Sequence, residues 1–218
     1  MPTQASLQAL QGLRDLSTLK WYVIPLLAIV LYIYTIEIKK ARQSGVWDAV
    51  LAGLTLFGMD FINETWNGWV FHLTQRSAFW TTPGDTALRT LVGWNIEIMF
   101  MFSIAGIVFY HTLLDRKEDK VFGVPNRWLF AVLFTIFCVF IECVLNYGGH
   151  LVWEYPWWNR SFAGIWLILI FGYFTFYLAI NIMLSFKTMK TKLVFIGCIY
   201  TIAILGNIIG LGILGFMY

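Results

Sequence analysis

The chain has 218 residues, of which 59% are hydrophobic and 12% are charged. A soluble domain carries about 25% charged residues, so this composition excludes an ordinary soluble protein and indicates a helical membrane protein. The net charge of +3 comes from basic residues in short segments between apolar runs, which argues against nucleic-acid binding.

The apolar runs predict an all-α, polytopic fold with six transmembrane helices. Residues 1–20 precede them, and leucine recurs at every third position from Leu7 to Leu16. This repeat suggests a short amphipathic helix at the membrane surface, although an irregular terminus fits it too. We expect residues 21–218 to form one domain, with spans over 21–38, 47–71, 92–114, 128–147, 162–186 and 193–217.

Basic residues concentrate in alternate loops between these spans. Loops 1, 3 and 5 hold ten of them: Lys39, Lys40, Arg42, Arg116, Lys117, Lys120, Arg127, Lys187, Lys190 and Lys192. Cytoplasmic loops are enriched in Lys and Arg. The pattern therefore predicts a multi-pass protein of the plasma membrane or an endomembrane, with both termini on the non-cytoplasmic side.

The second predicted span ends in a polar stripe. Its members, Asp60, Asn63, Glu64 and Asn67, are spaced i, i+3, i+4 and i+7, so they share one face of a helix. Carboxyl and amide groups are costly in hydrocarbon, and inside a membrane they usually face a bundle interior or a wet cavity. The stripe is therefore the first candidate for a functional site.

Two further spans bring acids to a similar depth. At about 1.5 Å per residue, Glu64 lies about 26 Å along the second span, Glu142 about 21 Å along the fourth, and Glu97 about 8 Å below the outer end of the third. These positions predict one polar level in the outer half of the membrane. Amides, loop groups and tryptophans near it complete the candidate binding site: Trp66, Trp69, Trp94, Asn95, Asn146, His150, Trp153 and Glu154.

A buried carboxyl group can hold its proton at neutral pH and donate it to an apolar substrate. We expect Glu64 and Glu97 to be the two indispensable acids, with Asp60 and Glu142 tuning them. Tryptophans around them could stabilise a carbocation. The alternatives are that the acids only form interhelical hydrogen bonds, or that the tryptophans anchor the chain at the lipid headgroups.

A metal site is a further alternative. Glu64, Glu97, Glu142 and His150 could supply oxygen and imidazole ligands. However, helical di-iron proteins use Glu-x-x-His pairs, which the chain lacks, and its three histidines are too few for a histidine-box oxygenase. We therefore expect neither a metal nor another cofactor.

The segment Asn63-Glu64-Thr65-Trp66-Asn67, which follows a first span and a short basic loop, resembles the small membrane-integral terpene cyclases of meroterpenoid pathways. In that family a membrane glutamate at the corresponding place is implicated as the acid, so the resemblance implies that role for Glu64. Those cyclases have seven spans and an acid in the last one, unlike this chain. The layout is also similar to emopamil-binding-type sterol isomerases, whose histidine four residues before a glutamate corresponds to Asp60.

These observations favour a membrane enzyme that performs acid–base chemistry on a lipophilic, isoprenoid or lipid-like substrate, as an isomerase, cyclase or hydratase. The rival functions are a proton- or cation-coupled transporter, a lipid-binding protein, a metal-dependent enzyme and a structural subunit of a membrane complex. Gly206 and Gly210 form a GxxxG face, which could pack within the bundle or mediate a homodimer.

Overall fold

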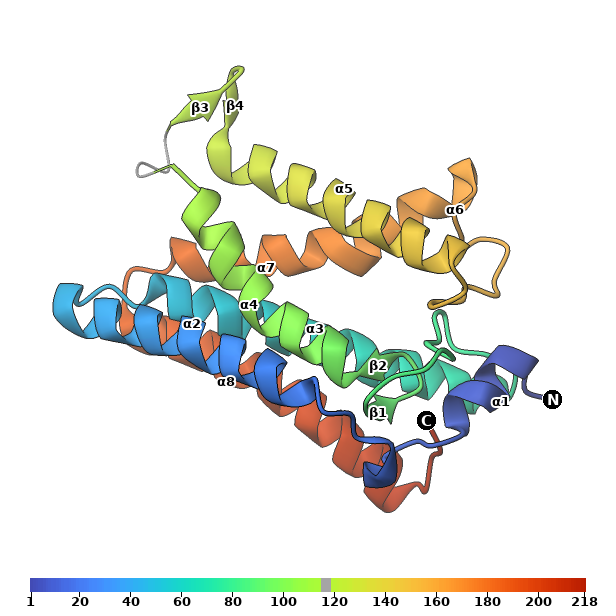
Figure 1. The fold of residues 1–218 in the computed structure, drawn as a ribbon. Helices are drawn as coiled ribbons and strands as arrows, with labels where there is room; N and C mark the ends of the chain where they lie inside the picture. Colours follow the sequence, from blue (N-terminus) through green and yellow to red (C-terminus); the bar gives the residue numbers. More distant parts are fainter. Residues whose placement is uncertain (115–118) are drawn as a thin grey trace.

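A computed structural model describes residues 1–114 and 119–218, and most of them are helical (Figure 1). Its elements, in chain order, are α1 (Gln4–Leu10), η1 (Leu16–Thr18), α2 (Val23–Ser44), α3 (Asp48–Thr74), β1 (Arg89–Leu91), β2 (Trp94–Asn95), α4 (Ile96–Thr112), β3 (Lys120–Val121), β4 (Val124–Pro125), α5 (Asn126–Tyr147), α6 (Phe162–Leu167), η2 (Ile168–Phe174), α7 (Thr175–Ser185), α8 (Met189–Asn207) and η3 (Ile208–Ile213).

Three helices of the described chain are long and apolar enough to cross a membrane. They are α5, with a mean hydropathy of 2.5, the continuous helix Phe162–Ser185, with 2.1, and the continuous helix Met189–Ile213, with 2.2. The helix Ile96–Thr112 is apolar but shorter. The described chain is therefore mostly helical, as predicted, although the all-α prediction did not include the short sheets β1–β2 and β3–β4.

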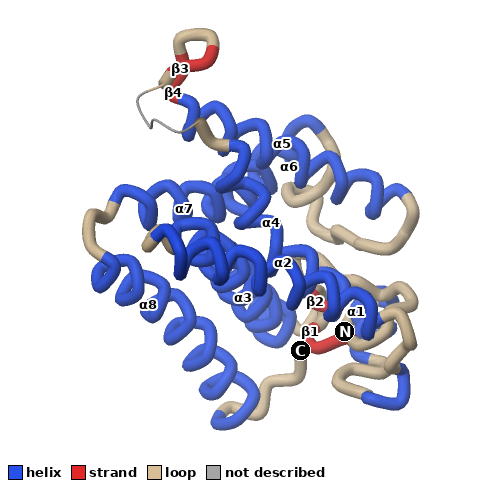
Figure 2. The backbone as a smooth tube through the Cα atoms, turned by 60° about the vertical axis from the view of Figure 1, so that its left-hand side comes forward, coloured by secondary structure: helices blue, strands red, loops and turns tan. Residues whose placement is uncertain are grey.

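Helix α3 lies at the centre of the bundle, and α2, α4, α7 and α8 pack around it. Helix α5 packs against η2 and α7 and forms the outermost layer on one side (Figures 1 and 2). Small residues allow the close approach of α4 to α3, since a Cβ added to Gly106 would lie 2.2 Å from the Ala52 carbonyl oxygen. This central position makes α3 the natural carrier of a site inside the bundle.

The connections divide between the two ends of the bundle. The segments 45–47, 113–114, 119–125 and 186–188 lie at one end, whereas both termini and the long loops 75–95 and 148–161 lie at the other (Figure 1). The basic loops thus share one end, as predicted, although Arg116 and Lys117 lie outside the described residues.

The two long loops and the N-terminal segment fold together into a cap over one end of the bundle. The Thr81 and Val152 backbones pair through reciprocal hydrogen bonds of 3.0 and 2.8 Å. Arg89 is buried and donates to the carbonyl oxygens of Thr82, Gln11 and Gly84 at 2.9, 3.1 and 2.6 Å. Charge-assisted hydrogen bonds of this kind hold the cap in one arrangement.

The N-terminal helix is shorter than the leucine repeat predicts. It ends at Leu10, because Gly12 and Arg14 adopt positive φ angles of 69° and 58°, which interrupt a right-handed helix. The segment then joins the cap, where the Arg14 N–H donates to the Arg89 carbonyl at 2.7 Å.

The GxxxG face of α8 and η3 packs within the chain. A Cβ added to Gly206 would lie 2.8 Å from the Thr65 methyl group, and one added to Gly210 would lie 2.6 Å from the Tyr218 hydroxyl. Of the two interpretations from the sequence, packing within the bundle therefore fits the structure. The three cysteines, Cys138, Cys143 and Cys198, are free thiols.

Candidate functional site

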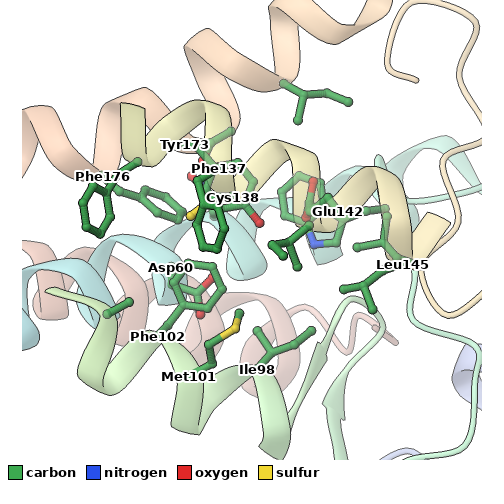
Figure 3. A pocket seen from close by; sticks show the side chains of 18 of the residues that line it. Asp60, Ile98, Met101, Phe102, Phe137, Cys138, Glu142, Leu145, Tyr173 and Phe176 are labelled. Atoms are coloured by element: carbon green, nitrogen blue, oxygen red, sulfur yellow. Dashed lines mark hydrogen bonds between the residues drawn. The ribbon is translucent and has the colours of Figure 1, made fainter. Parts of the chain in front are cut away.

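A cavity of about 270 Å³ lies between α4 and α5 and reaches inward to α3 and the η2 segment. Apolar and aromatic side chains make up most of its wall, and Figure 3 shows those of Met101 and Phe102 on α4 opposite Phe137 and Cys138 on α5. Ligand pockets usually measure about 300–1,000 Å³, so the cavity could hold part of a small lipid-like molecule.

Three carboxyl groups interrupt this apolar wall. Asp60 and Glu64 come from α3, and Glu142 comes from α5. Asp60 and Glu64 retain only 4% and 3% exposure, whereas Glu142 is partly exposed. The three groups are close enough to interact electrostatically with one another. None of the described residues that line the cavity is Lys, Arg or His, so no basic side chain on this wall neutralises them.

Asp60 is held by an indole. Its Oδ2 accepts a hydrogen bond of 2.7 Å from Trp94 Nε1, and the Trp94 ring stacks on Phe61 with a centroid distance of 5.1 Å. The rigid, buried tryptophan therefore fixes the orientation of the carboxyl group.

Glu64 is held in the same way by a tryptophan from the cap. Its Oε1 accepts a hydrogen bond of 2.7 Å from Trp80 Nε1. Its second oxygen, Oε2, is buried and makes no hydrogen bond to the described part of the chain. Buried polar atoms are rarely left without a partner. Within the described residues, Oε2 is therefore the oxygen of Glu64 that is left without a hydrogen-bond partner.

Glu142 lies beside a tyrosine on the cavity wall. Its carboxyl group interacts with the hydroxyl of Tyr173, which comes from the η2 segment. This segment is a π-helical insertion in an otherwise α-helical span, and such insertions are frequent at functional sites. Beside it, Cys138 and Tyr177 are linked by a hydrogen bond of 3.1 Å.

Asn67 joins the cavity to the cap. Its side chain accepts from the Phe79 N–H at 2.8 Å and donates to the Trp80 carbonyl at 2.8 Å. These bonds place the Trp80 ring over Glu64. Asn63 lines the cavity itself and donates to the Gly172 carbonyl at 3.1 Å. All four members of the predicted polar stripe therefore face the bundle interior.

Glu97 departs from the expectation that it faces Glu64. Its Oε1 accepts from the Tyr22 hydroxyl at 2.5 Å and from the Ala87 N–H at 2.9 Å, and its Oε2 accepts from the Thr86 hydroxyl at 2.5 Å. The reason is local. Because α4 begins only at Ile96, Glu97 lies in its first turn, within reach of the cap. Glu97 is absent from the described cavity wall and ties α2, α4 and the cap together.

Other predicted site residues lie around the cavity and do not line it. Trp94 acts through Asp60, Asn95 caps α4, and Asn146 donates to the Leu151 carbonyl at 3.0 Å. Trp66 and Trp69 line a separate surface groove between α3 and α8. Their polar or aromatic character thus serves the packing of the bundle and the cap.

The predicted loop residues lie in the cap. Glu154 accepts from the Thr3 hydroxyl at 2.6 Å, Trp153 is buried, and His150 is exposed beside Gly84. The set Glu64, Glu97, Glu142 and His150, considered as metal ligands, is therefore not assembled. In the described ranges, no group of three or more His, Cys, Asp or Glu side chains could hold a metal ion.

The sequence did not identify several residues of the wall as part of the site. Trp80 and Trp158 enter from the cap loops, and Tyr173 and Tyr177 enter from η2 and α7. Trp80 and Trp158 lie in predicted loops, where no helical or strand periodicity indicates which way a side chain points. For the tyrosines, the signal was an aromatic residue at i and i+4 in a span without charged residues.

Comparison with known proteins gives one family. A family model described as "Uncharacterized membrane protein family" matches residues 3–212. A protein of Archaeoglobus fulgidus, described as an uncharacterized protein, is 46% identical over 178 residues, which is 82% of each chain. No solved structure matches the chain significantly.

Proposed function

The chain belongs to this uncharacterized membrane protein family, and from its carboxyl-lined cavity we propose that it is a membrane enzyme that transfers protons to and from carbon in an apolar substrate. The observation that supports this most is the clustering of Asp60, Glu64 and Glu142 on an otherwise apolar and aromatic wall. A cavity with these parts can supply an acid, supply a base and exclude water from a carbocation.

The composition of the wall narrows the substrate class. An anionic head such as a carboxylate or a diphosphate would meet three acidic groups and none of the basic residues that usually bind it. The substrate we propose is therefore an uncharged isoprenoid or similar lipid with a double bond. The resemblance to membrane-integral terpene cyclases and sterol isomerases agrees with this choice.

Each acid has a role in the proposed reaction. Glu64 donates the proton on Oε2 to one alkene carbon, and the adjacent carbon becomes cationic. The indole of Trp80 remains hydrogen bonded to Oε1 and stabilises the carboxylate that forms. The rings of Trp80, Trp158 and Phe102 stand on the same wall and stabilise the cation.

The reaction ends when a neighbouring C–H bond breaks and its proton moves to Glu142. The double bond has then shifted, or a ring has closed first, and one proton has been taken up for each proton released. Asp60 interacts with both glutamates and allows the proton to return to Glu64. Three carboxylates in one buried site repel one another, so shared protons are favoured. Isomerisation and cyclisation both follow this scheme.

Deuterium incorporation tests the proposal for any product formed by protonation of an alkene carbon. The purified protein in lipid nanodiscs is incubated in D₂O with farnesol and squalene, and the products are analysed by mass spectrometry. We expect carbon-bound deuterium with at least one of them, and lipidomics of the purified protein should find a co-purifying neutral lipid.

Variants identify the acid. Glu64→Gln keeps the volume and the bond to Trp80 but removes the transferable proton, so incorporation should fall by about 10²-fold or more. The matched control is Asp85→Asn, which changes an exposed acid that does not line the cavity. Unchanged incorporation in Glu64→Gln would remove Glu64 from the mechanism. Absence of carbon-bound deuterium with every substrate would refute the proposed activity.

The same cluster favours a second candidate, proton- or cation-coupled transport, because carboxyl groups without basic partners can take up a cation. An assay in sealed vesicles distinguishes the two functions. A transporter acidifies or alkalises the lumen of a sealed vesicle when its substrate gradient is applied, whereas the enzyme changes the lipid and leaves the lumen unchanged.

We also propose the membrane arrangement in full: six spans, formed by α2, α3, α4, α5, Phe162–Ser185 and Met189–Ile213, with both termini non-cytoplasmic. The support is that the basic loops share one end of the bundle (Figure 1). Phe122, 97% exposed at the tip of the β3–β4 hairpin, marks that end. In intact cells, Phe122→Cys should resist a charged thiol reagent, whereas Asp85→Cys should react. The reverse pattern would invert the topology.

A further inference from the structure

The cavity is bordered on one side by residues that are exposed at the surface of the bundle. Met101 and Val108 on α4 are 47% and 50% exposed, and Phe137 on α5 is 60% exposed, yet all three line the cavity. In Figure 3, the labelled side chains of Met101 and Phe137 enter the space between α4 and α5, and Asp60 lies behind them on α3.

The end of the cavity beneath the cap is closed by aromatic rings. Trp80 and Trp158 are buried and stack with a centroid distance of 6.0 Å, and Phe79 stacks on Trp158 at 5.2 Å. The cap that carries Trp80 is fixed by the Asn67 hydrogen bonds and by the Thr81–Val152 pair. Entry through this end would require the cap to open.

The opposite end is closed in the same manner. The Phe109 ring lies 4.9 Å from Tyr177 and 5.3 Å from Phe134, centroid to centroid. Phe109 has no exposed area and Tyr177 has 1%. A polar molecule from the water on this side would have to displace a packed aromatic cluster.

We propose that the gap between α4 and α5 is a lateral portal, through which the hydrocarbon chain of a lipid enters the cavity directly from the bilayer. The inference rests on the proposed function for the meaning of the acids and on the six-span arrangement for the position of the lipid. All three exposed residues of the portal are apolar, and both α4 and α5 present apolar faces there. A chain that enters between Met101 and Phe137 meets Asp60 at the far wall.

Photolabelling tests the portal independently of catalysis. The protein is reconstituted in phosphatidylcholine vesicles that contain a phosphatidylcholine with a diazirine in its acyl chain, and labelled residues are mapped by mass spectrometry. We expect label on the inner-wall residues Phe102 and Tyr173 as well as on the lipid-facing residue Phe140. Label on Phe140 with none on the inner wall would overturn the proposal.

Two tryptophan substitutions supply a matched pair. Val108→Trp narrows the portal, whereas Val144→Trp changes an exposed α5 residue, 54% exposed, that does not line the cavity. We expect Val108→Trp to lose the inner-wall label and Val144→Trp to keep it. Equal labelling in the two variants would contradict the portal. Should Val108→Trp fail to fold, the wild-type label pattern still decides.

A second measurement covers entry from water. In a protein with Cys143→Ser and Cys198→Ser, a charged, water-soluble thiol reagent should leave Cys138 on the cavity wall unmodified. Rapid modification of Cys138 would show an aqueous route and overturn the proposal. Glu64→Gln should not alter the photolabel. Inner-wall label without deuterium incorporation would therefore refute the enzyme and keep the portal.

Discussion

Gly93 offers a direct test of how tightly the Glu64 site is built. It lies in the hairpin loop between β1 and β2, and its φ angle is not positive, so its backbone accepts alanine. A Cβ at this position would lie 2.6 Å from Glu64 Oε2, 2.6 Å from Trp80 Nε1 and 2.7 Å from Asn67 Nδ2. A methyl group would therefore contact the three side chains that define the site.

The expected cost follows from these distances. Ordinary contacts begin near 3.4 Å, so the three polar atoms must retreat by about 1 Å against a packed interior. Overpacking of this kind costs about 1–3 kcal/mol, and losing the hydrogen bond from Trp80 to the Glu64 carboxyl, which is protonated in the proposed mechanism, adds about 0.5–1.5 kcal/mol. A destabilisation of about 1.5–4.5 kcal/mol corresponds to a fall in Tm of about 3–18 °C for a chain of this size.

The assay is thermal unfolding in detergent, with Gly197→Ala as the matched control. A Cβ at Gly197, in the middle of α8, meets nothing within 4 Å. In a helix interior this change should stabilise by about 0.5–1 kcal/mol. A Gly93→Ala protein that melts at the wild-type temperature, or gains stability as Gly197→Ala should, would refute the close packing of Glu64, Trp80 and Asn67.

Three further predictions concern the surroundings of the site. Tyr22→Phe should lower stability by about 1–2 kcal/mol, measured by Tm, because Glu97 loses a hydrogen-bond donor. Deuterium incorporation should persist in this variant, and a loss of incorporation would return Glu97 to the mechanism. Asn67→Ala should lower the free energy of unfolding by about 2–4 kcal/mol and expose the cap to limited proteolysis. A cap that stays resistant to the protease would contradict the role of the Asn67 hydrogen bonds in holding it. The Lys20 ammonium lowers the pKa of Asp85, so their ion pair should stabilise fully above pH ~4 and fade below it, a fade that Asp85→Asn should abolish.

The parts of the site that could be predicted from the sequence are those fixed by one helix. The spacing of Asp60, Asn63, Glu64 and Asn67 sets one face of α3, and the structure turns that face inward, because helical periodicity does not depend on the neighbouring helices. Glu142 reaches the same cavity because its depth along α5 is similar to the depth of Asp60 and Glu64 along α3.

The depth of Glu97 along its predicted span was not enough to predict where its side chain lies. The predicted span began at residue 92, but residues 91–95 form a turn and a short strand instead, so α4 starts later and turns Glu97 toward the Ala87 N–H. The direction in which a residue points around a helix axis depends on where the helix begins, and boundaries are the least reliable feature of a sequence-based assignment.

The tryptophans of the cap could not be placed for a different reason. Trp80 and Trp158 belong to loops whose shape depends on long-range pairs, such as the Thr81–Val152 hydrogen bonds and the Asn67 clamp. No periodicity encodes such pairs. The two indoles nevertheless determine the site. Trp80 holds Glu64, and Trp158 stacks on Trp80 and closes the cavity.

The two indole–carboxyl bonds suit the proposed reaction. In each, a neutral donor that cannot lose its N–H at ordinary pH holds one carboxyl oxygen, so the proton transferred in the proposed reaction resides on the other oxygen or on Glu142. A basic partner would instead have fixed a carboxylate as the stable form. The pairing of Asp60 with Trp94 and of Glu64 with Trp80 therefore orients each acid without fixing its charge, which is what the proposed proton transfer to an apolar substrate requires.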